Sequence, residues 1–159
     1  MSSLIGVDGR PRRRLGLAVA VAAVLLMAGC VAPTTTDDGY RVKLAGTVRD
    51  ISSAIASAKV AVGLELAGKM AFALTDEIVS DAEADADSAL ASWESRQPPS
   101  DAALRLHDRA KDTLHEAVDA LESLRIAVRR GDRAAIRRAL AGLDQPDTAL
   151  GELDRVVSG

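Results

Sequence analysis

The stretch Ser100–Asp132, SDAALRLHDRAKDTLHEAVDALESLRIAVRRGD, decides the fold that this sequence predicts. One series recurs in it at every third or fourth position: Ala103, His107, Ala110, Leu114, Ala117, Leu121, Leu124 and Val128. This spacing places a mainly apolar series on one face of an α-helix, as a seam on which other helices can pack. Ser100 suits the N-cap of such a helix, and Gly131 suits the position that follows its end. The stretch therefore predicts a long helix over 101–130 within a bundle.

Three further segments repeat this spacing and predict helices over about 40–67, 70–97 and 132–157. Their series are Leu44, Val48, Ile51, Ile55, Ala58 and Val62, then Leu74, Ile78, Ala82, Ala86, Ala89 and Trp93, and finally Ile136, Leu140, Leu143, Leu150, Leu153 and Val157. Pro98 and Pro99 should end the second helix, whereas Gln145-Pro146 should kink the last one. Gly68 is expected to separate the first two helices, although residues 63–75 contain no proline and one long kinked helix is the alternative.

The composition agrees with an all-α fold. Only 2% of the 159 residues are aromatic, whereas strands draw heavily on aromatic and β-branched residues. Short connections between long helices make successive helices antiparallel neighbours. We therefore expect one domain over 40–159, an up-down-up-down four-helix bundle.

The first thirty residues contain the three parts of an export signal. Arg10-Pro11-Arg12-Arg13-Arg14 is basic, Leu15–Met27 is apolar, and the small residues Ala28 and Gly29 precede Cys30. The apolar run is shorter than the roughly 18 residues that would indicate a membrane span. The arginines are compatible with either Sec or twin-arginine export.

The sequence Met27-Ala28-Gly29-Cys30 resembles the lipobox of bacterial lipoprotein precursors. The resemblance implies that the Cys30 thiol receives a diacylglyceryl group, that the chain is cut between Gly29 and Cys30, and that the new N-terminus is acylated. Residues 1–29 are then removed, and 30–39 become the lipidated cysteine and a flexible tether on the extracytoplasmic face of the cell membrane. The chain also resembles small helical lipoproteins of GC-rich bacteria such as actinobacteria, a resemblance that carries no catalytic residues. A free surface thiol at Cys30 is the alternative.

Charge and cysteine content exclude some classes of function. The chain has 20 basic and 23 acidic residues, and loss of segment 1–29 would leave 16 and 22, a net charge of −6. Nucleic-acid binders need a basic face, so nucleic acid is not an expected partner. Because Cys30 is the single cysteine, a disulfide framework and CxxC motifs are absent from the sequence.

One acidic run matches a calcium-loop pattern in part. Glu83, Asp85, Asp87, Ser88, Leu90 and Glu94 fall at positions 1, 3, 5, 6, 8 and 12 of an EF-hand-like loop. That loop needs glycine at position 6 for its sharp turn, and Ser88 stands there. We interpret the run as an acidic helix face, and expect no metal or cofactor other than the lipid on Cys30.

Two other short patterns have structural explanations. His107 and His115 lie eight residues apart, and Asp112 with His115 forms one acid-x-x-His unit, where di-iron bundles need two such units and further glutamates. Arg130-Gly131-Asp132 spells the integrin-binding tripeptide, but the end of one helix and the N-cap of the next account for it.

Charge is segregated along the chain, with acidic residues gathered in the second helix. A basic cluster surrounds the junction of the third and fourth helices and is the candidate partner surface: Arg125, Arg129, Arg130, Arg133, Arg137 and Arg138. In a bundle tethered at its N-terminus, this junction lies about 40 Å from the tether, so lipid headgroups are not its expected ligand unless the bundle lies flat on the membrane. The alternative is a solvated surface on which some arginines pair with acids of the second helix.

No nucleophile elbow, His-Glu-x-x-His, P-loop or dinucleotide motif is present in the sequence. We therefore expect a membrane-anchored protein-interaction or scaffold module, with an envelope protein as partner. A carrier or sensor of a small ligand or ion within the bundle is the alternative. An enzyme is the least supported class, since its only obvious acid-base groups would be His107 and His115.

Overall fold

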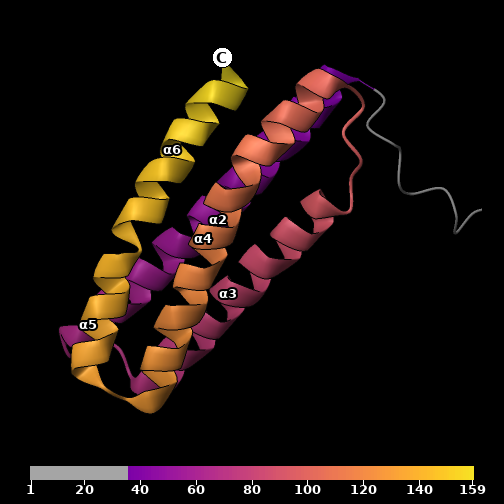
Figure 1. Cartoon of the computed structure of the whole chain (residues 1–159). Helices are drawn as coiled ribbons and strands as arrows, with labels where there is room; N and C mark the ends of the chain where they lie inside the picture. Colours follow the sequence, from indigo (N-terminus) through magenta and orange to yellow (C-terminus); the bar gives the residue numbers. More distant parts are fainter. Residues whose placement is uncertain (1–35) are drawn as a thin grey trace, which may run out of the picture. The chain divides into compact units, whose positions relative to one another are not determined.

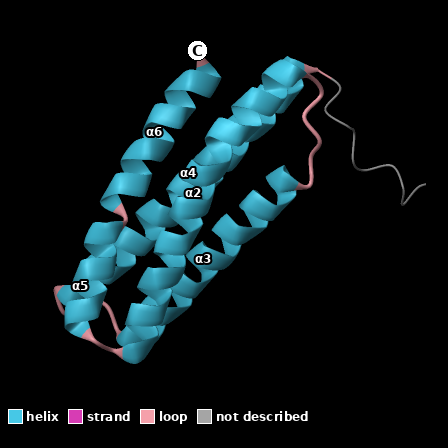
Figure 2. Ribbon diagram, viewed as in Figure 1, coloured by secondary structure: helices cyan, strands magenta, loops and turns pink. Residues whose placement is uncertain are grey.

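The computed structural model describes residues 36–159, and this part of the chain forms five α-helices: α2 (Asp37–Leu66), α3 (Phe72–Glu94), α4 (Asp101–Arg130), α5 (Arg133–Gly142) and α6 (Asp144–Ser158). In Figure 1, α5 and α6 follow each other in one direction and together make the fourth member of a bundle. Figure 2 shows that only short loops join the helices. The predicted all-α four-helix bundle is confirmed.

The helices pack around one core. α2 contacts α3 and α6, α4 contacts α3, α5 and α6, and α2 also meets α4 across the centre. The described residues form one compact unit, and its core cluster extends from Tyr40 to Val157. This unit therefore has a complete core of its own. Among residues 36–159, no helix combines the length and the apolar character needed to span a membrane.

The α4 seam is buried as predicted. All seven apolar members of its series are buried, and His107 is partly buried. The six residues predicted for the inner face of α2 are also buried. Since these two helices carry most of the core leucine, isoleucine and valine, their seams set the register of the whole bundle.

The predicted tether over 30–39 is too long. α2 begins at Asp37, and the Gly39 N–H donates to Thr36 Oγ1 at 3.1 Å. Asp37 and Asp38 occupy the first turn, where negative charge is favourable beside the helix N-terminus. A capping threonine followed by two acids was therefore the true start signal. The predicted signal segment 1–29 and Cys30 lie outside the described residues.

The predicted inner face of α3 is partly wrong, and so are its ends, which were placed at 70 and 97. Ala82, Ala86 and Trp93 are buried as expected, but Leu74 is 47% exposed, and Thr75, Val79 and Leu90 are buried instead. Shifting by one residue rotates a helix face by about 100°. The alanines of α3 give little contrast between faces, and Val79 and Leu90 decide the rotation because they offer more apolar surface.

α2 and α3 are separate helices, which excludes the long kinked helix. Gly68 has a positive φ of 70°, a conformation that glycine adopts without a Cβ clash. The Gly68 N–H donates to the Glu65 carbonyl and the Lys69 N–H donates to the Leu64 carbonyl, both at 2.8 Å. These two bonds satisfy carbonyls at the helix end in the Schellman arrangement.

The fourth helix of the bundle is interrupted two residues before the kink that was predicted at Gln145-Pro146. α5 ends at Gly142, Leu143 lies between the helices, and Pro146 falls in the first turn of α6. A proline is tolerated there because first-turn N–H groups have no partner within the helix. Pro146 therefore starts a helix and does not kink one.

Two glycines give a matched test of the α4–α5 turn. Gly131 has φ of 65°, while Gly151 lies within α6, and an added Cβ would meet no atom within 4 Å at either position. We expect Gly131→Ala to lower the free energy of unfolding by about 1 kcal/mol, because the left-handed conformation disfavours a side chain. Gly151→Ala should raise it by about 0.5 kcal/mol. Urea unfolding followed by circular dichroism measures both, and equal effects would contradict the turn geometry.

Candidate functional site

Two of the six arginines of the predicted partner surface contact acidic residues of α3. Arg125 Nε lies 2.9 Å from Glu83 Oε2, and Arg129 Nε lies 3.5 Å from Asp76 Oδ1. The Arg125 contact is short enough for an ion pair but is not aligned as a hydrogen bond. Both pairs join α4 to α3, so Arg125 and Arg129 hold helices together.

The other four, Arg130, Arg133, Arg137 and Arg138, are exposed and form no ion pair with any residue that the structure describes. We call this group the arginine end. It surrounds the α4–α5 turn, at the opposite end of the bundle from Thr36, where the described chain begins (Figure 1).

Asp132, which lies within this turn, acts on the backbone. Its Oδ1 accepts from the N–H groups of Ala134 at 2.9 Å and Ala135 at 3.1 Å. These backbone hydrogen bonds, with a smaller effect from the charge of Arg138, lower the pKa of the Asp132 carboxyl. Asp132 thus caps α5, and its carboxylate forms no ion pair with any of the four arginines around it.

Three ring side chains meet near the Thr36 end. Tyr40 Oη lies 2.8 Å from His107 Nδ1, and the Trp93 ring stacks on the His107 ring with centroids 4.5 Å apart and planes 19° apart. These residues come from α2, α3 and α4, so the cluster joins three helices. Burial, opposed by the nearby Trp93 indole and assisted by the charge of Asp108, raises the pKa of Tyr40 to about 12. The indole Nε1 itself is buried without an aligned hydrogen-bond partner.

His115 lies elsewhere and joins α4 to α3 through Glu94. Its Nε2 is 2.7 Å from Glu94 Oε1, beside a groove of about 340 Å³ between these helices. The calcium-loop pattern around Glu94 is not a loop, since all six of its residues lie in the continuous helix α3. Within residues 36–159, no three or more His, Cys, Asp or Glu side chains are grouped so that they could hold a metal ion.

A groove of about 610 Å³ lies between α2 and α3. Its lining consists mainly of serine, aspartate and alanine, and it opens to solvent. Pockets for small organic ligands are mostly apolar and bury most of the ligand surface. This groove therefore offers a carrier little of what such a ligand requires.

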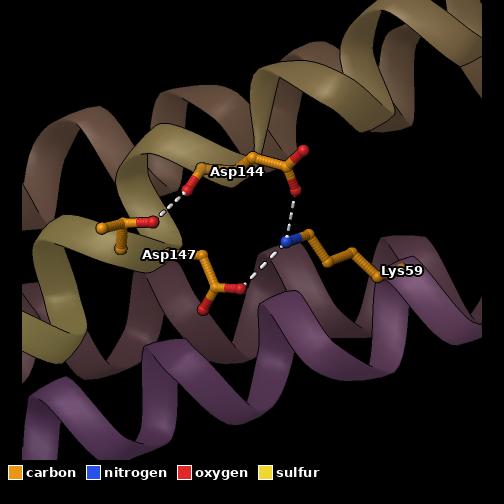
Figure 3. Close-up of polar contacts among 4 residues, drawn as sticks. Lys59, Asp144 and Asp147 are labelled. Atoms are coloured by element: carbon orange, nitrogen blue, oxygen red, sulfur yellow. Dashed lines mark hydrogen bonds and ion pairs between the residues drawn. The ribbon is translucent and has the colours of Figure 1, made fainter.

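Lys59 of α2 holds the start of α6. Figure 3 shows its Nζ between Asp144 Oδ1 and Asp147 Oδ2, at 2.8 and 2.9 Å. Burial lowers the pKa of Lys59, but the hydrogen bonds and charges of the two aspartates outweigh it and raise the pKa overall. This contact fixes the helix that follows the break at Leu143.

No protein-family model matches the chain, and neither the curated proteins nor the solved structures include a significant match to it.

The sequence pattern missed two features of these contacts. Tyr40 lies one turn before Leu44 and extends the α2 series, so its burial could have been predicted. Its hydrogen bond to His107 could not. Lys59 gave no signal either, because it and Asp147 are 88 residues apart. Both contacts require knowledge of which helix faces which.

The Tyr40 environment can be measured directly, because Tyr40 is the only tyrosine. Tyrosinate absorbance of residues 34–159 should give a pKa of about 12 in the folded state and about 10 in urea. Since the folded pKa is the higher one, the stabilising contribution is complete below about pH 10 and is lost as pH rises through 12. Circular dichroism identifies the pH range in which the domain is folded. A midpoint near 10 within that range would contradict the buried hydroxyl.

The Lys59 contact should also contribute to stability. Lys59→Met is expected to lower the free energy of unfolding by about 1 kcal/mol, because a two-fold ion pair is lost and Asp144 and Asp147 then repel each other. Lys43→Met, at an exposed position of the same helix, is the control and should change little. The difference should fall at high pH, since Lys59 loses its charge above its raised pKa. Equal effects of the two substitutions would show that the contact does not stabilise the fold.

Proposed function

We propose that this chain is a lipoprotein, anchored through Cys30 on the extracytoplasmic face of the cell membrane, whose bundle is a protein-interaction module. The observation that supports the module is the arginine end. Its four guanidinium groups have no acidic partner among the described residues and are exposed. Arginine side chains left free for carboxylates are common at protein interfaces.

The geometry of the bundle suits this role. Six residues, Val31–Thr36, link Cys30 to α2 and can reach about 20 Å at most. α2 has 30 residues and is therefore about 45 Å long. An anchor at Cys30 would keep the Thr36 end near the membrane, and in an upright bundle the arginine end would lie away from it.

The remaining candidate functions have less support. A carrier would use the α2–α3 groove, which is open and polar. An enzyme would use the histidines, yet His107 is held between Tyr40 and Trp93, and His115 is bonded to Glu94. These contacts give both rings a part in packing the helices.

Replacing Cys30 tests the anchor. In the full chain, we expect Cys30→Ala to move the protein from the membrane fraction to the extracytoplasmic fluid or to leave it as an uncut precursor. Ala32→Ser, which keeps the cysteine, should leave the protein in the membrane fraction. Mass spectrometry of the mature N-terminal peptide should show the acyl groups on Cys30. Retention of the Cys30→Ala protein as a cut chain in the membrane would refute the lipid anchor.

A further inference from the structure

The arginine end also carries exposed apolar side chains. Phe72 and Leu74, at the start of α3, are each 47% exposed. The chain has three aromatic residues of the Phe, Trp and Tyr types, and Tyr40 and Trp93 are buried. Phe72 is therefore the one such ring that the fold leaves on its surface.

The ion pair between Asp76 and Arg129 shows where Phe72 lies in the bundle. Asp76, one turn later on the same face of α3, contacts Arg129 in the last turn of α4. Phe72 is one turn closer to the end of the bundle, where Arg130 ends α4 and Arg133 begins α5. In Figure 1, the start of α3 and the α4–α5 turn lie together at the bottom of the view.

An exposed aromatic ring beside unpaired arginines has the composition of an interaction hot spot. The ring can fill an apolar pocket on a partner, and guanidinium groups bind carboxylates through two parallel hydrogen bonds. The mature chain carries a net charge of −6, so this basic surface contrasts with the rest of the domain. Its complement is an acidic surface around an apolar pocket.

We propose that Phe72, Arg130 and Arg133 form a docking surface for a protein that presents carboxylates around an apolar pocket. The inference depends on the proposed function, since it names the class of partner for the arginine end. An anionic membrane would also attract arginines and a phenylalanine ring. A reach of about 20 Å from Cys30 is too short to invert a bundle about 45 Å long, so the arginine end could meet the membrane that holds the anchor only if the bundle lay flat on it, and a lipid adduct from position 72 would reveal that orientation.

Site-specific photocrosslinking in living cells tests the docking surface in the full chain. A benzophenone amino acid replaces Phe72 in one variant and Val156 in the control. Val156 is 60% exposed, lies in α6 and is remote from the arginine end. We expect one protein adduct from position 72 and none from position 156. No adduct, a lipid adduct alone, or the same adduct from both positions would overturn the proposal.

Charge reversal then tests the arginines. Arg130→Glu with Arg133→Glu should reduce the adduct from position 72 by about tenfold or more, because attraction to the partner carboxylates becomes repulsion. Arg41→Glu with Arg155→Glu makes the same change in charge at exposed positions near the Thr36 end and should leave the adduct unchanged. An adduct that survives the first pair, or is lost equally in both, would overturn the proposal. Thermal unfolding of residues 34–159 checks that each variant folds.

The same cells distinguish failure of the docking surface from failure of the anchor. Membrane fractionation of every variant reports on Cys30 independently of any adduct. Membrane retention without an adduct refutes the docking surface and keeps the anchor. An adduct that depends on Arg130 and Arg133 in a chain that is not membrane-bound refutes the anchor and keeps the docking surface.

Discussion

The burial of the large apolar side chains of α2 and α4 at the centre of the bundle is the constraint on which the rest of the structure depends. Of 30 buried apolar residues, ten are alanines, which bring helix axes close but bury fewer methylene groups than leucine would. The branched side chains that supply the remaining burial are concentrated on α2 and α4, at positions such as Ile51, Ile55, Leu114 and Leu121. α3 and the α5–α6 pair cover the two sides of this central contact. A loss of register between α2 and α4 would therefore expose both flanking surfaces together.

The polar groups act mainly at the edges of that core. Arg125 and Arg129 join α4 to α3, Lys59 joins α2 to α6, and the Tyr40–His107 bond joins α2 to α4. In an alanine-rich core, such contacts select one rotation of each helix, because alanine faces resemble one another. The four arginines of the arginine end differ from these residues, since they form no contact that joins one described helix to another.

The sequence predicted most where side chains differ most in size. The α2 and α4 series were correct because leucine, isoleucine and valine mark one face clearly. The predicted rotation of α3 was wrong because alanines lie on both faces of this helix, and Leu74 was assigned to the buried face although it is exposed. For the candidate site, the pattern grouped six arginines and left open that some of them pair with acids of the second helix, but it could not show that these are Arg125 and Arg129. Phe72 was missed because its exposure depends on where α3 begins, and that boundary is set by the Gly68 turn.

The two ends of the bundle differ in a way that suits presentation of a surface at a distance. At the Thr36 end, Ser100 Oγ donates to Asp37 Oδ1 at 2.7 Å, and Tyr40, Trp93 and His107 pack together. α2, α3 and α4 are thus joined within the first turns after the chain enters the domain. A force or orientation imposed at Thr36 would be transmitted by three helices at once, over about 45 Å. At the other end, the turns at Gly68 and Gly131 satisfy their own backbone groups, so the arginines and Phe72 are not needed to close the fold. The residues that join the helices at the Thr36 end are therefore different from the exposed, chemically distinct residues at the other end, so either set can change without altering the other.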